Sequence, residues 1–239
     1  MKSSVVKWLK IKYDIWSVDA KYKGNKRVFI ENFVEFYQKR RFRQFGVLHP
    51  HNSINQPVIN GLSLNKDANE NMPSSFYSIK KAFKNLRIKF RDICLLDIGC
   101  GSGRVLSFGM LLKFKNVAGV DLDEKGIQKA IDNCQQLQKK GIKTTYNIQV
   151  ADASQYDIPE DTNVIYLFNP FGEKTMSIVA DNIIKHCQRL SKDIYVVYCN
   201  PVHMDVFMNR KECIRTFESF FKNKRRELAI FRITKNVLA

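Results

Sequence analysis

The sequence lacks any apolar stretch close to the roughly 18 residues that a membrane-spanning helix needs. Its start, MKSSVVKWLKIKYDIW, is interrupted by lysine too often to form the apolar region of a secretory signal peptide. Internal repeats and low-complexity tracts are also absent. We therefore expect an intracellular, cytoplasmic protein.

Neither a C-x-x-C pair nor a zinc-ligand spacing occurs in the sequence. The cysteines are scattered, and several stand inside apolar runs such as ICLLDIGC and IYVVYCN, where a reduced thiol behaves as a small hydrophobe. We interpret all six as core residues of a cytosolic protein, and we expect no metal site: Cys94, Cys100, Cys134, Cys187, Cys199 and Cys213.

The composition suits one α/β domain with an N-terminal extension. The chain has 239 residues, of which 44% are hydrophobic, enough for a sizeable core. Its net charge of +17 is concentrated at the two ends, where residues 1–70 and 201–239 carry the densest excess of Lys and Arg. Such ends attract phosphate-rich or acidic partners. The ordinary alternative is solubility combined with a lysine-rich composition.

Hydrophobic periodicity divides the chain near residue 72. Before it, residues 5–16 and 28–45 have helical spacing, and residues 46–72 are rich in Asn, Gly, Pro and Ser, which indicates irregular loop. After it, a helix over 74–86 with Ser74 or Ser75 as N-cap is followed by strands that alternate with helices. We predict a basic N-terminal extension over residues 1–72 and a catalytic domain over residues 73–239.

The fold class follows from the alternation in the second segment. Five predicted strands that alternate with helices indicate a mostly parallel sheet with helices on both faces. Two further β-rich runs, CIRTFESFF and ELAIFRIT, flank the turn KNKRR and predict a closing antiparallel hairpin. We therefore expect an α/β, Rossmann-like sheet that ends in that hairpin.

The strongest local motif is the glycine loop of LLDIGCGSGR, between the first strand of this domain and the next helix. This position is the ligand crevice of an open α/β sheet, and glycines there allow close approach of the backbone. The spacing is G-x-G-x-G, because Arg104 stands where a dinucleotide fingerprint has its third glycine. Asp97, two residues before the loop, fits a cationic ligand better than a pyrophosphate. A purely structural turn is the alternative.

Two more aspartates follow the next two predicted strands. Asp121 can accept hydrogen bonds from both hydroxyls of a ribose, with Asp123 as a competitor that can cap the following helix instead. Asp152 can accept a hydrogen bond from an adenine amino group while the Ala153 N–H meets a ring nitrogen. Each aspartate alone could be a helix cap. Carboxylates at three successive strand ends favour a binding site.

Together, LLDIGCGSGRVL, GVDLDEKGI, VADASQYDIP and IYLFNPFGEK resemble the ordered motifs of the class I S-adenosylmethionine-dependent methyltransferases, over residues 73–239. The resemblance implies a seven-stranded sheet whose last strand is antiparallel, and S-adenosylmethionine as cofactor. It also implies which residues bind each part of the cofactor. These are Asp97, Gly99, Cys100, Gly101 and Gly103 for the methionine moiety, Asp121 and Leu122 for the ribose, Asp152 and Ala153 for the adenine, and Ser75, Phe76 and Tyr77 on a covering helix.

The fourth strand ends in Asn169-Pro170-Phe171-Gly172. This tetrapeptide resembles the Asn/Asp-Pro-Pro-aromatic motif of methyltransferases that act on amino groups, although its aromatic residue comes third. The resemblance implies that Asn169, Pro170 and Phe171 hold the acceptor, with Asn169 also next to the cofactor. The alternative is a tight turn, since Asn-Pro and Gly are turn formers.

The acceptor stays open at this point. An amino group of a protein or small molecule is the first choice, followed by nucleic acid and then by a sugar or lipid hydroxyl, for which His203 is the candidate base. A catalytically inactive binding module is the competing class. The basic, aromatic N-terminus could bind nucleic acid or an anionic membrane surface, or it could cover the substrate side of the domain.

Overall fold

The computed structural model describes residues 17, 19–49, 73–190 and 192–235. The helix expected over residues 5–16 and most of the expected loop over residues 46–72 lie outside these residues. Within the described residues, no helix is long and apolar enough to span a membrane.

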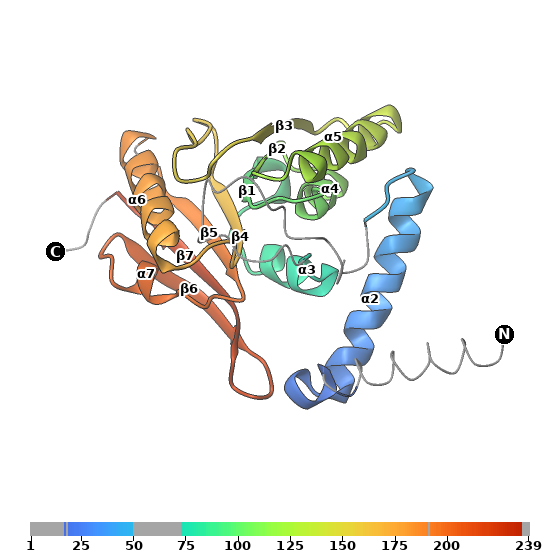
Figure 1. Cartoon of the computed structure of the whole chain (residues 1–239), viewed down its shortest axis with the longest axis horizontal. Helices are drawn as coiled ribbons and strands as arrows, with labels where there is room; N and C mark the ends of the chain where they lie inside the picture. Colours follow the sequence, from blue (N-terminus) through green and yellow to red (C-terminus); the bar gives the residue numbers. More distant parts are fainter. Residues whose placement is uncertain (1–16, 18, 50–72, 191, 236–239) are drawn as a thin grey trace.

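A seven-stranded sheet organises the domain, in the order β3-β2-β1-β4-β5-β7-β6 (Figure 1). The first five strands run parallel, whereas β7 pairs antiparallel with both β5 and β6. The Rossmann-like fold with its closing hairpin is thus confirmed. The strand bounds are β1 Cys94–Ile98, β2 Asn116–Asp121, β3 Thr145–Val150, β4 Val164–Phe168, β5 Ile194–Cys199, β6 Cys213–Phe220 and β7 Arg226–Ile233.

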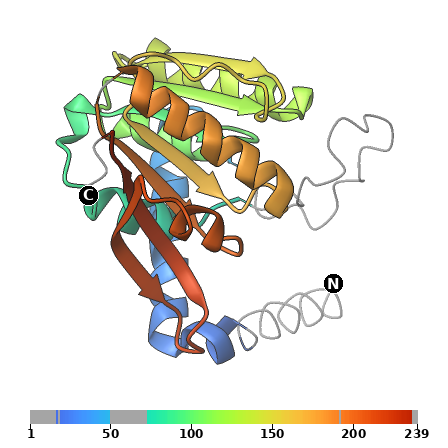
Figure 2. The same ribbon diagram turned by 90° about the vertical axis from the view of Figure 1, so that its left-hand side faces the viewer.

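Helices cover both faces of this sheet (Figure 2). One core cluster packs α3, α4 and α5 against one face, and a second packs α6 and α7 against the other. The 20-residue helix α2 lies outside this layer and packs on α3. The helix bounds are α2 Asn25–Gln44, α3 Phe76–Lys84, α4 Arg104–Leu111, α5 Glu124–Lys139, α6 Glu173–Leu190 and α7 Asp205–Met208, with a 3₁₀ turn η1 at Phe90–Asp92.

Strand β1 is central, and all five of its residues are buried. Its neighbours are β2 and β4, so the chain builds the sheet outward from β1 in one direction and then returns to build in the other. In open α/β sheets, ligands bind at this switch point, outside the carboxyl ends of the strands. The segments that follow β1, β2, β3 and β4 are therefore brought to one edge.

Candidate cofactor and acceptor site

The glycine loop joins β1 to α4 at this edge. Gly99, Gly101 and Gly103 have φ angles of 79°, 49° and 72°, in the left-handed region that strains other residues. A Cβ at Gly103 would lie 2.8 Å from the Cβ of Ala130, and one at Gly99 would lie 3.0 Å from the Cβ of Pro170. Glycine is therefore required on steric grounds where the loop passes α5 and the turn after β4.

Cys100 contributes its backbone to this loop. Its N–H and that of Gly99 donate to the carbonyl of Val120 over 3.1 and 2.9 Å, which fixes the loop to the end of β2. Its sulfur lies beside Gly119, where an added Cβ would come within 2.9 Å of it. Burial raises the pKa of the Cys100 thiol well above its usual value, and Asp97 and Asp121 raise it further. The residue is thus a neutral thiol, not a nucleophile.

Asp121 lies against the glycine loop. Its Oδ2 accepts from the Gly101 N–H over 2.8 Å, and its Oδ1 accepts from the Asp123 N–H over 2.9 Å. Asp123 is instead the N-cap of α5, where its side chain accepts from the Lys125 N–H over 3.1 Å. Of the two competing carboxylates, Asp123 therefore has the capping role, and Asp121 is the one in contact with the loop.

Asp97 is a buried carboxyl group, only 3% exposed, on the central strand. Desolvation raises its pKa well above the usual value, and the nearby charge of Asp121 raises it further. Within the described part of the chain, no Lys, Arg or His forms an ion pair with Asp97. A cation bound at this edge would compensate the carboxylate, whereas an anion would be repelled.

Asp152 and Ala153 follow β3, beside the end of β2. The Ala151 N–H donates to the Asp121 carbonyl over 3.1 Å, so the two strand ends are adjacent. One oxygen of Asp152 accepts both the N–H and the hydroxyl of Ser154, each over 2.8 Å. These bonds fix the orientation of the Asp152 carboxylate, whereas Ala153 packs against the α6 side of the core.

The ends of β4 and β5 form a second polar group. Asn169 has a left-handed backbone with φ of 43°, and its Oδ1 accepts from the Tyr198 hydroxyl over 3.2 Å. The same hydroxyl accepts from the His203 N–H over 3.3 Å. Phe171 is buried in the core cluster under α6. The tetrapeptide is therefore a constrained turn that presents Asn169 and Pro170 beside Gly99, with the Phe171 ring as its anchor.

Helix α3 has a more structural role than the family resemblance implies. Ser75 is its N-cap, and its Oγ accepts from the Ser78 N–H over 3.1 Å. Phe76 is fully buried and lies between the rings of Phe42 and Phe108, at 5.3 and 5.8 Å. The Tyr77 ring lies under the guanidinium of Arg27, 3.4 Å from its centroid. Phe76 is thus unavailable to a ligand, and at least one face of the Tyr77 ring is covered.

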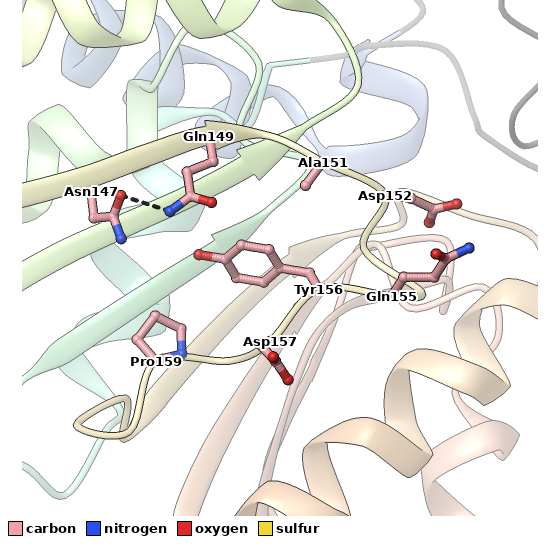
Figure 3. A pocket seen from close by; sticks show the side chains of 8 residues that line it. All are labelled: Asn147, Gln149, Ala151, Asp152, Gln155, Tyr156, Asp157 and Pro159. Carbon is pink, nitrogen blue, oxygen red and sulfur yellow. Dashed lines mark hydrogen bonds between the residues drawn. The ribbon is translucent and has the colours of Figure 1, made fainter.

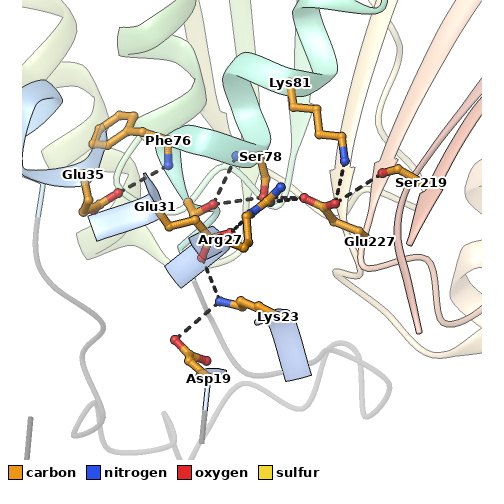
Figure 4. A network of polar contacts seen from close by, with 11 residues as sticks. Asp19, Lys23, Arg27, Glu31, Glu35, Phe76, Ser78, Lys81, Ser219 and Glu227 are labelled. Carbon is orange, nitrogen blue, oxygen red and sulfur yellow. Dashed lines mark hydrogen bonds and ion pairs between the residues drawn. The ribbon is translucent and has the colours of Figure 1, made fainter. Parts of the chain in front are cut away.

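The sequence motifs missed two ionic clusters that tie α2 to the domain. In the first, Arg104, the residue after the glycine loop, donates to Glu35 over 2.9 Å and to the Ser74 carbonyl over 3.1 Å. Glu35 also accepts from the Phe76 N–H over 3.3 Å (Figure 4). One carboxylate of α2 therefore joins the end of the glycine loop to the start of α3. These partners are too far apart in sequence for any local pattern to reveal the contact.

The second cluster centres on Glu227 of β7, whose side chain is 2% exposed. Arg27 of α2 pairs with it, and Lys81 of α3 does so over 2.7 Å. The hydroxyls of Ser78 and Ser219 lie 3.5 and 3.3 Å from the same carboxylate (Figure 4). This residue therefore links α2, α3 and the closing hairpin at a single buried point.

A hollow of about 540 Å³ lies beside the site, between one face of β3 and the segment over residues 155–159 (Figure 3). Tyr156 projects toward Gln149 there, while the Asp152 side chain points away from it. Of the expected cofactor residues only Asp152 lines this hollow. We therefore place the candidate crevice at the strand ends, around the glycine loop, and not in the hollow.

The strand order and the closing antiparallel hairpin define an α/β, Rossmann-like methyltransferase fold. Residues 95–193 match the family model described as a methyltransferase domain. Over these residues the chain therefore carries a methyltransferase domain, which supports a transferase enzyme. No curated protein matches its sequence.

Solved structures agree on the fold at low sequence identity. An RNA methyltransferase from Salinibacter ruber in complex with S-adenosyl-L-homocysteine is 11% identical, with a TM-score of 0.51 over 70% of this chain and 96% of that one. A protein of the NADB-Rossmann superfamily from Streptococcus agalactiae is 13% identical, with a TM-score of 0.51 over 70% of this chain and 72% of that one. At such identities the similarity establishes the fold, and the acceptor has to be argued from the site.

Proposed function

We propose that this enzyme transfers a methyl group to an amino nitrogen of a protein or small-molecule acceptor. The observation that carries the cofactor part of the proposal is Asp97, a carboxyl group buried at the switch point without an ion-pair partner among the described side chains. Such a group favours a ligand that brings its own positive charge. The glycine loop beside it passes so close to Pro170 and Ala130 that a Cβ at Gly99 or Gly103 would collide with them.

The cofactor, S-adenosylmethionine, supplies a methyl group activated by a positively charged sulfur. We assign Asp97, Gly99, Cys100, Gly101 and Gly103 to its methionine end. The unused lone pairs of the fixed Asp121 carboxylate are directed to ribose hydroxyls, with Leu122 beside them. Asp152 and the Ala153 N–H are assigned to the adenine, and Asn169 and Tyr77 to the rim. Fixed carboxylates need no reorganisation on binding, which favours affinity.

For the acceptor, the argument rests on Asn169 and Pro170. The side-chain oxygen of Asn169, which the Tyr198 hydroxyl orients, and the carbonyl of Pro170 are hydrogen-bond acceptors, and the Pro170 ring lies beside Gly99 of the glycine loop. An amine donates its N–H bonds to two such oxygens, which directs its lone pair toward the methyl donor. Alignment of this kind can contribute about 7–11 kcal/mol to a reaction between two bound groups. A neutral amine needs little help from a base.

A hydroxyl acceptor, on a sugar, lipid or nucleic acid, is the alternative reaction. It requires a general base, and His203 is the candidate because its backbone is bonded to the Tyr198 hydroxyl that orients Asn169. A cytoplasmic location and an anionic partner for the basic residues 1–72, nucleic acid or membrane surface, are also part of the proposal. An inactive binding module would not need the fixed carboxylates described above.

Calorimetry tests the assigned cofactor site, and turnover tests the assigned acceptor site. Asp121→Ala should weaken S-adenosylmethionine binding at least tenfold, because the carboxylate hydrogen bonds are charge-assisted. Asn169→Ala should leave that affinity within about threefold and abolish methyl transfer. Labelled methyl transfer into separated protein, RNA, lipid and small-molecule fractions of a cell extract would identify the acceptor. Label in lipid or sugar alone would refute an amino-group acceptor. Retained activity of Asn169→Ala would refute the role of Asn169 in holding the acceptor.

A further inference from the structure

The outward face of α2 combines aromatic rings with positive charge. Phe29, Phe33, Phe36 and Tyr37 are 71%, 63%, 67% and 54% exposed, although three of them are wholly apolar. They recur at intervals of three and four residues, so they share one face of the helix. An apolar surface of this kind on a globular domain indicates an interaction site.

The charges on this helix are segregated. All ten exposed residues of α2 are aromatic, basic or amide-bearing, with Lys26, Arg40 and Arg43 as the cations. The two acidic residues of the helix, Glu31 and Glu35, are on the inner side and are held in ion pairs. The outward face is therefore positive as well as aromatic.

The turn of the β6–β7 hairpin extends this surface. The Asn223 N–H donates to the Tyr22 carbonyl over 3.3 Å, and a Cβ at Gly24 would lie 3.4 Å from Lys222 Cδ. The hairpin turn thus lies beside the residues that precede α2 (Figures 1 and 2). Four consecutive or near-consecutive cations are exposed in it: Lys222, Lys224, Arg225 and Arg226.

We propose that this surface, made by the outward face of α2 and the turn over residues 221–226, binds a single strand of nucleic acid. Its phosphates complement the cations, and its unpaired bases stack on the rings, as in single-strand binding proteins. Phe29, Phe33 and Tyr37 are successive at four-residue intervals, about 6 Å apart along the helix. That is close to twice the roughly 3.4 Å rise of a stacked strand, so a base fits between consecutive rings.

Three arguments favour a single strand of nucleic acid over the other occupants. Arg40 lies within the aromatic stripe, one turn after Phe36, so insertion of the rings into a bilayer would bury a guanidinium. A second copy of this chain would place the same positive surface against itself. A duplex has no exposed base faces along its length for the rings to stack on. This inference deepens the proposed anionic partner and is independent of the amino acceptor.

Binding of the full-length protein to fluorescent single strands of RNA and of DNA, about 12 nucleotides long and without cofactor, tests the proposal. Alanine substitution of an aromatic that stacks on a base weakens binding about 5- to 150-fold per ring, so the double variant Phe29→Ala/Phe33→Ala should bind at least about 25-fold more weakly. The variant Lys222→Gln/Lys224→Gln should reduce the slope of the salt dependence by about 0.7 for each phosphate that it no longer neutralises. Phe90→Ala, an exposed aromatic on η1, is the matched control and should bind normally.

Several results would overturn the proposal. These are equal affinity of the Phe29→Ala/Phe33→Ala variant and the parent, tighter binding of the corresponding duplex, or absent oligonucleotide binding. In the last case, ring-dependent binding to phosphatidylserine vesicles would identify a membrane surface, and a dimer dissociated by the same variant would identify a second copy. S-adenosylmethionine affinity, measured on the same variants, should be unchanged. A loss there would report on the proposed methyltransferase site instead.

Discussion

Removal of the Glu227 charge should destabilise the protein more than any surface ion pair can. Glu227→Gln keeps the size of the side chain but leaves Arg27 and Lys81 without their shared counterion. Loss of one partner of a fully buried ion pair costs about 3–5 kcal/mol. Here the cations retain 16% and 23% exposure, and Arg27 has Glu31 as a second partner over 2.8 Å. We therefore expect destabilisation by about 2–3 kcal/mol.

Chemical denaturation and thermal unfolding measure this effect. For a chain of this length the expected destabilisation corresponds to a decrease in Tm of about 4–12 °C. Asp193→Asn is the matched control, because it breaks a pair with Arg232 at 3.7 Å in which the two side chains are 42% and 41% exposed. Such pairs contribute about 0–1 kcal/mol. Hydrogen exchange should also show lower protection of α2 amides in Glu227→Gln than in the control.

A double-mutant cycle with Arg27→Met gives the decisive comparison. If the buried contact acts as the geometry indicates, the two substitutions should be coupled by at least about 1 kcal/mol. A Glu227→Gln variant no less stable than Asp193→Asn, with additive effects in the cycle, would refute the reasoning.

The other predictions concern groups whose pKa values are shifted. Because the pKa of Asp97 is raised in the folded protein, ionisation of this group costs stability as the pH rises from its unfolded pKa toward its folded one. Asp97→Asn should therefore make the cofactor-free protein more stable at neutral pH, yet weaken S-adenosylmethionine binding. Unfolding curves measure the stability and calorimetry measures the binding. A variant less stable than the parent would contradict the predicted gain in stability. Since a bound cation favours the ionised carboxyl, cofactor affinity of the parent should rise with pH and binding should release protons, with Asp97→Asn losing that dependence. Burial lowers the pKa of His49 to about 3, so its contribution to stability is present above its usual pKa of 6.5 and is lost as the pH falls below it. At a pH of about 5, the neutral buried His49 destabilises the parent protein by about 2 kcal/mol, and His49→Phe should remove this effect. The free energy of unfolding of the parent and of His49→Phe, measured at pH values of about 5 and 7.5, tests this. An equal change in that free energy between the two pH values in both proteins would contradict the prediction.

The strands and helices of the catalytic domain could be predicted because their periods are local. DICLLDIG is continuously apolar and forms a strand buried on both faces. The N-cap at Ser75 and the hairpin turn at residues 222–226 follow from short-range chemistry in the same way. Helix α2 shows what a local pattern cannot predict. It buries Val28 and Phe42 but exposes a row of phenylalanines, so its pattern does not show which side meets the domain.

In the candidate site, too, some features follow from the local sequence and others depend on tertiary contacts. The glycine loop and its neighbouring aspartates could be predicted because parallel strands bring their carboxyl ends to one edge whatever the loops contain. The choice between Asp121 and Asp123, by contrast, depends on which carboxylate the Gly101 N–H reaches, and Phe171 is a core residue because α6 covers it.

The sequence by itself determined the class of fold and the edge of the sheet at which the candidate site residues gather, since both depend on the residue types in the strands and directly after them. Tertiary structure alone decided that α2 is held to the domain, through Arg104 with Glu35 and through Glu227 with Arg27 and Lys81. Charged partners separated by 69 to 200 residues leave no periodic trace in a sequence. Their pairing exists only once the sheet and its covering helices have excluded water from the space between them.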